Sequence, residues 1–258
     1  MNRTLKGILY IILVAGLFIL LGFANRMHES VRCKSFQVSI KDDHEYRLVK
    51  EQEVREIVSS LYDSIVNRPL RQINTHLIEE ELRQNPFIGQ VDVFSGINGD
   101  LNIQIEQRIP LLRIIDKKNN AYYIDREGNL FRSAVNKAAR VLVVNGDIPA
   151  VSFPKKTAII SVDSLDHGKI EEIFRLAELI ERDAFLNAQI EQLYLDGRNY
   201  ELIPKVGKHV IEFGACERAA EKLENLKAFY TRGLRNKDWN QYKKINLKFK
   251  NQIVCTKI

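Results

Sequence analysis

The side chains that could do chemistry are few and scattered along the chain. The five histidines form no HExxH pattern and stand at no metal-ligand spacing from the cysteines, so the sequence predicts no metal site. Gly168-Lys169 and Gly207-Lys208 lack the upstream glycine of a phosphate-binding loop, and no G-x-S-x-G turn is present. With no nucleophile, base or metal to name, the sequence predicts a protein that is not an enzyme and that needs no cofactor. The histidines are His28, His44, His76, His167 and His209.

Acidic and sulfur side chains also have structural explanations. Asp125-Arg126-Glu127-Gly128 gathers two acids, but a hairpin turn accounts for them. Cys33, Cys216 and Cys255 form no CxxC pair and no zinc spacing, which is typical of small buried hydrophobic residues. A disulfide between Cys216 and Cys255 is compatible with a location outside the cytoplasm, and the sequence leaves this open.

Positive charge is concentrated at the end of the chain. Residues 232–258 contain eight lysines or arginines and one acid, Asp238, for a segment charge of +7. Because the whole chain carries +6, the remaining residues are close to neutral. Nucleic-acid binding would predict a basic face interleaved with aromatic residues, so a basic tail alone does not favour a nucleic-acid partner.

The N-terminus predicts a membrane helix. Gly7–Ala24 is an uncharged run of 18 residues, which would span about 27 Å as a helix, close to the hydrocarbon thickness of a bilayer. We expect a cytoplasmic tail at residues 1–6 and a transmembrane helix at residues 7–26, with the bulk of the chain outside. A cleaved signal peptide is the alternative, because Gly22-Phe23-Ala24 resembles a small-x-small cleavage site.

The next segment predicts a small layered α+β domain. Phe36–Ile40 alternates as a strand does, and Glu51–Leu61 has its apolar residues at helical spacing. Asn74 is placed to cap a second helix that ends at Gln84, with Leu77, Ile78 and Leu82 expected on its inner face. A hairpin at Phe87–Glu106 completes the order β-α-α-β-β, in which two helices cover one face of a three-stranded sheet.

The rest of the chain, from residue 109, predicts a mixed, mostly antiparallel β domain with helices. Helices are expected at Lys169–Glu181 and Glu217–Tyr230, where apolar residues recur at helical spacing. Strands are expected at Leu111–Ile115, Ala121–Ile124, Leu130–Phe131, Val141–Val144, Ile159–Val162, Ile190–Leu195, Tyr200–Pro204 and His209–Phe213.

The last strand is the best candidate for a binding site. We expect it to lie at a sheet edge, where unpaired backbone groups can accept a strand from a partner. Ile245, Leu247 and Phe249 would pack inward, and Lys244, Lys248 and Lys250 would face acidic groups of the partner. The alternative is that these lysines protect the edge from unwanted strand pairing, and physical reasoning weighs the two about equally.

Two stretches carry a family resemblance. Asn85-Pro86-Phe87-Ile88, followed by a hairpin that closes with Glu106-Gln107-Arg108-Ile109-Pro110, resembles the end of a POTRA (polypeptide-transport-associated) domain, here residues 33–108. The sequence from Ala121 to Phe131, AYYIDREGNLF, resembles the start of the second domain of the bacterial cell-division family FtsQ, also called DivIB. With a hydrophobic N-terminus, the similarity covers the chain in order.

The resemblance implies a non-catalytic, single-pass inner-membrane scaffold of the division machinery, with its bulk in the periplasm and enrichment at the septum. In that family the final strands bind the coiled-coil proteins FtsB and FtsL, and Ile245-Asn246-Leu247-Lys248-Phe249 matches the family's apolar-x-apolar-basic-aromatic strand. The POTRA domain is expected to dock other membrane proteins of the division complex. A POTRA-bearing docking subunit of outer-membrane protein export, or an exported membrane-tethered hydrolase, are the alternatives.

Overall fold

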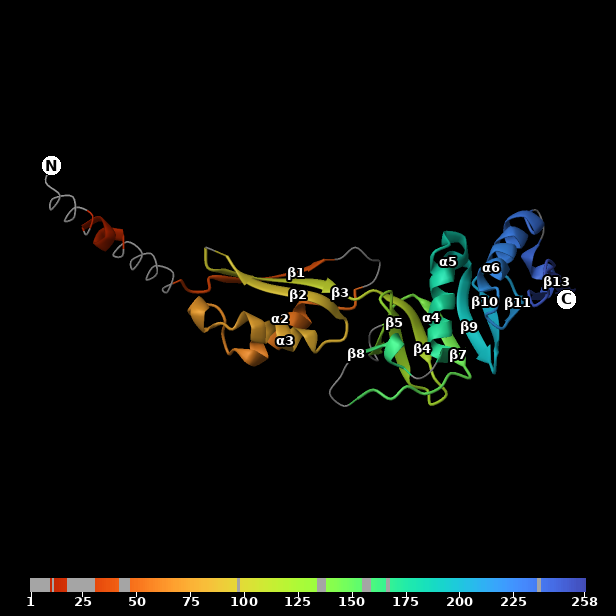
Figure 1. Cartoon of the computed structure of the whole chain (residues 1–258), viewed down its shortest axis with the longest axis horizontal. Coiled ribbons are helices and arrows are strands. Elements are labelled where there is room, and N and C mark those ends of the chain that lie inside the picture. The colour runs from red at the N-terminus through yellow and green to blue at the C-terminus, as the bar shows by residue number, and fades with distance from the viewer. Residues whose placement is uncertain are drawn as a thin grey trace. The chain divides into compact units, whose positions relative to one another are not determined.

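The computed structural model describes residues 10, 12–17, 31–41, 47–96, 98–133, 138–154, 159–165, 168–235 and 238–258. All of the predicted cytoplasmic tail and most of the predicted transmembrane helix, residues 7–26, lie outside these ranges. Among the described residues, no helix has both the length and the apolar character needed to cross a membrane. The chain divides into two compact units, Met1–Gln107 and Arg108–Ile258, and each is described by itself (Figure 1).

The first unit is a three-stranded sheet with two helices. Its elements are β1 (Ser35–Lys41), α2 (Glu51–Leu61), α3 (Thr75–Arg83), β2 (Ile88–Ser95) and β3 (Asp100–Gln107). The sheet order is β1-β3-β2, with β1 parallel to β3 and β2 antiparallel to it. Both helices lie on the same side of the sheet (Figure 1), so the predicted order β-α-α-β-β is confirmed.

Local hydrogen bonds explain where these elements begin and turn. The Asn74 side chain caps α3 by accepting from the backbone N–H of Leu77 at 3.1 Å. The Asn85 side chain accepts from the backbone N–H of Phe87 at 3.0 Å, and this turn leads from α3 into β2. Gly99 has φ +94°, and a Cβ there would lie 2.6 Å from a backbone oxygen, so the β2–β3 turn requires glycine.

The core of the first unit forms between the helices and the inner face of β3. Ile78 and Leu82 of α3 are fully buried, as are Leu101 and Ile103 of β3. The prediction that Leu77 also faces inward is wrong, because its side chain is 41% exposed. Leu77 follows the capping turn directly and lies on the solvent side of a helix whose buried stripe is Ile78 and Leu82.

The second unit is a ten-stranded sheet with three α-helices among the described residues. The helices are α4 (Gly168–Glu181), α5 (Ala184–Gln189) and α6 (Ala219–Ala228), and α6 continues as a π-helix over Phe229–Gly233. The strands are β4 (Pro110–Ile115), β5 (Ala121–Asp125), β6 (Asn129–Arg132), β7 (Leu142–Gly146), β8 (Ile159–Ser161), β9 (Ile190–Asp196), β10 (Asn199–Pro204), β11 (Val210–Gly214), β12 (Tyr242–Asn246) and β13 (Val254–Lys257).

The sheet of the second unit is mixed, as predicted. Its order is β13-β12-β11-β10-β9-β7-β4-β5-β6-β8. Parallel pairs join β4 to β7, β7 to β9 and β11 to β12, and the other pairs are antiparallel. Gly146 ends β7 beside β9, where a Cβ would lie 2.2 Å from the Leu195 backbone oxygen, so only glycine fits.

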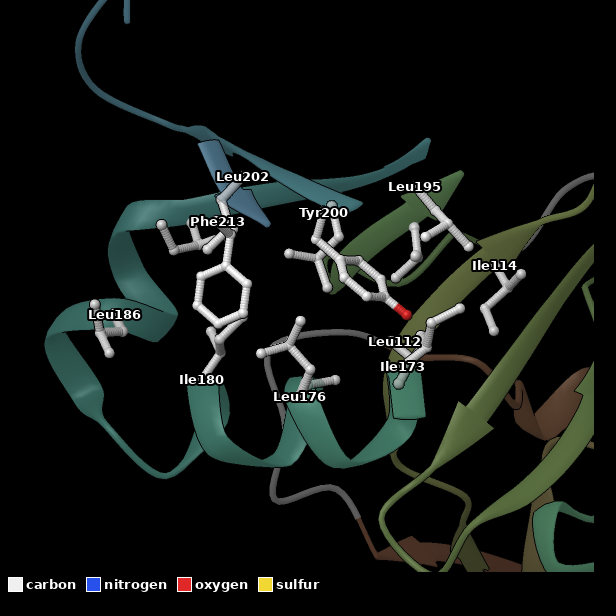
Figure 2. Close-up of a cluster of buried hydrophobic side chains, with 14 of the residues drawn as sticks. Leu112, Ile114, Ile173, Leu176, Ile180, Leu186, Leu195, Tyr200, Leu202 and Phe213 are labelled. Carbon is white, nitrogen blue, oxygen red and sulfur yellow. The ribbon is translucent and has the colours of Figure 1, made fainter. Parts of the chain in front are cut away.

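Helix α4 covers the middle of this sheet. Ile173, Leu176 and Ile180 project from it toward the strands, where Tyr200 and Phe213 meet them (Figure 2). These five side chains are almost completely buried, and burying an aliphatic side chain of this size contributes about 1.5–3 kcal/mol. The Tyr200 hydroxyl donates to the Glu172 carboxylate at 2.7 Å, which satisfies the one polar atom of that ring.

Candidate partner-binding site

The predicted partner-binding residues lie on β12 and the turn after it. The prediction that this strand is a sheet edge is wrong, because β12 pairs with β11 on one side and with β13 on the other. Its backbone groups are therefore used within the chain. The edge of the sheet at this end is β13, which the sequence shows only as the short apolar run Ile253-Val254-Cys255.

β12 is also shorter than the alternating pattern suggests. The strand ends at Asn246, whose side chain accepts from the backbone N–H of Lys248 at 2.9 Å and so turns the chain. Ile245 and Leu247 are buried in the core, as predicted. Phe249 lies beyond the end of the ladder and is 50% exposed, so the prediction that it packs inward is wrong.

Two of the three predicted lysines bind their own chain. Lys244 Nζ lies 2.7 Å from Glu212 Oε1, and Lys248 Nζ lies 3.2 Å from Glu212 Oε2. The hydrogen bond from Lys244 is the main reason that the pKa of the Glu212 carboxyl is lowered, and the same bond raises the pKa of Lys244. Glu212 thus links β11 to Lys244 of β12 and to Lys248 in the turn after that strand. Lys250 is exposed and forms no ion pair with a described residue.

The direction of the backbone in β13 follows from its neighbours. The Leu247 N–H donates to the Glu212 carbonyl, so the backbone groups of Leu247 point toward β11. Successive residues of a strand direct their backbone groups to opposite sides, so those of Lys244 and Asn246 point toward β13. Their partners are Thr256 and Val254. The intervening residue, Cys255, therefore directs its own N–H and C=O away from β12.

The hairpin of β12 and β13 exposes apolar as well as basic side chains. Val254 is 44% exposed and Ile258 is 80% exposed, in addition to Phe249. Among the described residues, β13 pairs with β12 alone and stands at the end of the sheet. We call β13 together with exposed Phe249, Lys250 and Ile258 the C-terminal edge. Asn251 has φ +59° in the turn between β12 and β13, a conformation that asparagine tolerates better than most residues.

A buried histidine fixes the segment that leads into β12. His209 Nδ1 lies 3.3 Å from the Trp239 carbonyl oxygen, and Nε2 lies 2.6 Å from the Tyr230 hydroxyl. Because a carbonyl can only accept, Nδ1 carries the proton and Nε2 accepts from Tyr230. Burial lowers the pKa of His209 and raises that of Tyr230 to about 12, which keeps both groups neutral. This bond set joins the residue before β11, the π-helix that follows α6 and the short 3₁₀ helix before β12.

The cysteines and acids of the described residues do not form a reactive site. No three of their His, Cys, Asp or Glu side chains gather as metal ligands. All three cysteines are free thiols, including Cys216 and Cys255, whose pairing the sequence left open. Burial is the main cause that raises the pKa of Cys216 to about 12, so this thiol is protonated at neutral pH.

Comparison with known families agrees with the two-unit structure. Residues 109–256 match the family model described as FtsQ/DivIB, C-terminal related. That match covers more than half of the chain. The chain belongs to the FtsQ/DivIB family. Residues 31–106 match the POTRA-like domain, so the resemblance seen in both parts of the sequence is confirmed.

A curated relative adds a name from the same family. The chain is 23% identical over 143 residues to the cell division protein FtsQ of Syntrophotalea carbinolica. The match covers 55% of this chain and 48% of the relative, so the chain spans about half the length of the curated relative that it matches. The relative is named as a cell division protein, and the two family matches of this chain lie within its two compact units.

Proposed function

We propose that this protein is a non-catalytic, single-pass inner-membrane scaffold of the bacterial division complex. In this proposal residues 1–6 are cytoplasmic, residues 7–26 cross the membrane, and a POTRA domain at 33–108 and a β domain at 109–258 lie in the periplasm. The protein recruits FtsB- and FtsL-like coiled-coil proteins to the septum. Its POTRA domain docks other membrane proteins of the complex.

The observation that supports this proposal best is the open β13 edge. A strand that is paired on one side only can add an extended segment of a partner through backbone hydrogen bonds, while exposed side chains select that partner. The exposed Phe249 supplies an apolar contact and Lys250 a positive charge. Of the other predicted contact residues, Ile245 and Leu247 support the edge from the core, and Lys244 and Lys248 clamp β12 through Glu212.

Removal of a single backbone N–H, that of Cys255, tests the proposed site. Cys255→Pro removes the outward N–H of β13 without removing a bond to β12, because proline is tolerated on an edge strand whose N–H faces solvent. We expect pull-down of the FtsB/FtsL-like pair to fall at least about tenfold. Cys255→Ala is the matched control, because it changes the side chain and keeps the N–H, and it should bind as the wild type does. Equal binding by the proline variant would rule out strand addition at β13.

Fractionation tests the membrane anchor separately. Full-length protein should remain in the membrane fraction after washing with high salt, because an apolar helix is held by burial of its side chains and not by charge. A mature form that begins at Asn25 and is recovered in the soluble fraction would show that the N-terminal segment is a cleaved signal peptide. The partner-binding test with Cys255 does not depend on this result.

The POTRA-like match leaves one alternative, a docking or chaperone subunit of outer-membrane protein export. Depletion of the protein distinguishes the two roles. A division scaffold should leave filamentous cells without septa, whereas an export subunit should leave septation intact and reduce the outer-membrane proteins. The second result would overturn the proposed function.

A further inference from the structure

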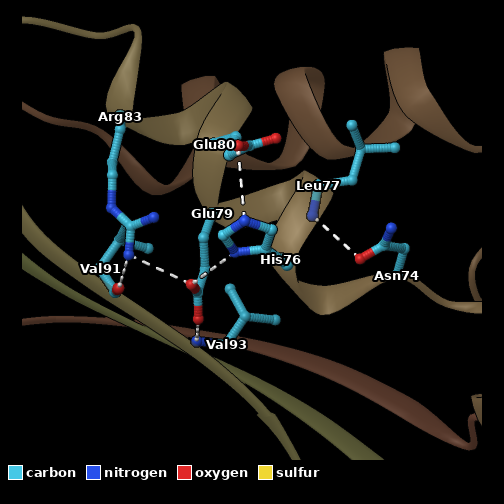
Figure 3. A network of polar contacts seen from close by, with 8 residues as sticks. All are labelled: Asn74, His76, Leu77, Glu79, Glu80, Arg83, Val91 and Val93. Atoms are coloured by element: carbon cyan, nitrogen blue, oxygen red, sulfur yellow. Dashed lines mark hydrogen bonds and ion pairs between the residues drawn. The ribbon is translucent and has the colours of Figure 1, made fainter.

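Side chains of α3 cover the outer edge of β2. The Glu79 carboxylate accepts from the backbone N–H of Val93 at 3.0 Å, and the Arg83 guanidinium donates to the backbone C=O of Val91 at 3.4 Å (Figure 3). The same two side chains pair with each other at 3.1 Å. Within the part of the chain that the structure describes, β2 pairs only with β3, so the groups that they cover belong to the free edge of the sheet.

The covered groups are those that an added strand would use. In an antiparallel ladder, alternate residues direct both backbone groups toward the neighbouring strand, and the residues between them direct both groups outward. Val91 and Val93 share one parity, and because α3 side chains bond to their backbone groups, both residues direct those groups away from β3. The Glu79 carboxylate accepts from the N–H and the Arg83 guanidinium donates to the C=O. These side chains therefore replace the acceptor and the donor that an added strand would present.

Helix and strand geometry allow this match. Residues four apart on a helix are separated by about one turn, 5.4 Å. Residues two apart on an antiparallel strand are separated by about 6.8 Å. One i,i+4 pair of long side chains can therefore reach two successive outward residues of an antiparallel strand, as Glu79 and Arg83 do for Val93 and Val91.

The other edge of this sheet has a similar cover. Arg55 of α2 donates to the Phe36 carbonyl of β1 at 3.4 Å, and its guanidinium lies 4.9 Å from the centre of the Phe36 ring. Arg55 also pairs with Glu51, one helical turn earlier, at 2.6 Å. Each helix of the first unit thus uses a Glu–Arg pair at i,i+4 beside the strand edge that it covers.

We propose that the Glu79–Arg83 pair is a lock that closes β2 to strand addition, and that a second copy of this chain, pairing β2 with β2, is the strand it excludes. Two identical strands that pair antiparallel present the same groups to each other, so they form a closed two-fold dimer. An open β2 edge can therefore pair with the β2 edge of a second copy. The lock acts in the first unit and does not depend on the partner proposed for β13.

The test compares full-length chains in the same detergent. Glu79→Ala/Arg83→Ala removes the lock, and Glu178→Ala/Arg182→Ala removes a comparable i,i+4 pair at the C-terminal end of α4, 3.3 Å apart. We expect the wild type and the control to sediment as monomers and the unlocked variant to dimerise with rising concentration. The same concentration dependence in the control, or a monomer in the unlocked variant, would overturn the proposal.

Hydrogen exchange separates opening of the edge from general unfolding. In Glu79→Ala the Val93 amide should exchange about tenfold faster, whereas amides of β3, which is paired on both sides, should keep the wild-type rate. Glu79→Gln keeps an acceptor oxygen at the same position and should stay monomeric and protected. An unchanged Val93 rate in Glu79→Ala would show that the carboxylate does not cover the edge.

Discussion

The guanidinium of Arg108 is bound to the carboxylate of Asp125, whose side chain is fully buried. Arg108 belongs to the signature that leaves the last strand of the first unit, and Asp125 ends β5. Asp125 also accepts from the backbone N–H groups of Glu127 and Asn129, which holds the turn into β6. One ion pair therefore joins the signature that follows β3 to the turn that follows β5.

Removal of Asp125 should destabilise the second unit strongly. Asp125→Ala leaves a largely buried guanidinium and two turn N–H groups without this carboxylate, and breaking a buried pair costs about 3–5 kcal/mol. The fluorescence of Trp239, the one tryptophan in the chain, reports unfolding of this unit in denaturant. Glu181→Ala is the control, because it breaks an exposed pair with Arg126 and should cost less than about 1 kcal/mol.

Acid should weaken the second unit through His209. Because burial lowers the pKa of His209 in the folded state, the unfolded chain binds its proton more readily, so stability is complete above about pH 6.5 and falls as the pH is lowered below it. We expect the free energy of unfolding to drop by about 1 kcal/mol between pH 7.5 and 5.5. In His209→Asn this dependence should be flatter; an equal slope in both proteins would exclude His209 as its source.

A charge at Phe249 should abolish partner binding without unfolding the domain. Phe249 is half exposed, so Phe249→Asp loses little core packing but places a carboxylate on the apolar part of the C-terminal edge. Pull-down of the FtsB/FtsL-like pair should fall at least about tenfold. Tyr194→Asp is the matched control on β9, a similarly exposed aromatic four strands from β13, and it should bind normally.

Lys250 and Lys248 should respond differently to charge reversal. Lys250→Glu should weaken the complex mainly at low salt and leave the free energy of unfolding unchanged, since Lys250 forms no ion pair with a described residue. Lys248→Glu should also cost about 0.5–1 kcal/mol of stability, because it places a second carboxylate beside Glu212. Binding titrations between 50 and 300 mM salt, with denaturation of each variant, would show whether the two effects separate.

Local sequence patterns predicted which residues form helices and strands better than they predicted which strands pair with each other. Helix α2 has the predicted bounds, because its apolar spacing is a property of adjacent turns. Helix α5 was missed, since its six residues are too few to show a period; its signal was Asp183, which caps it and pairs with Lys227 at 2.6 Å. The parallel pairs, such as β1 with β3, join distant segments and leave no local trace.

The errors at the candidate site have the same cause. Alternation continues from Ile245 to Phe249, but the backbone leaves the ladder after Asn246, whose side chain captures the N–H of Lys248. Nothing in that alternation shows that β13 folds back outside β12. The predicted role of the lysines was wrong for a similar reason. Glu212, which binds Lys244 and Lys248, lies on another strand, so the sequence near the lysines does not show this pairing.

The parallel pairing of β11 and β12 ties the C-terminal edge to the rest of the sheet through a distant connection. Parallel neighbours need a long crossover, and here it runs through α6. Among the described residues β13 reaches the sheet only through β12, so the edge proposed for recruitment exists only where the β11–β12 pairing is formed.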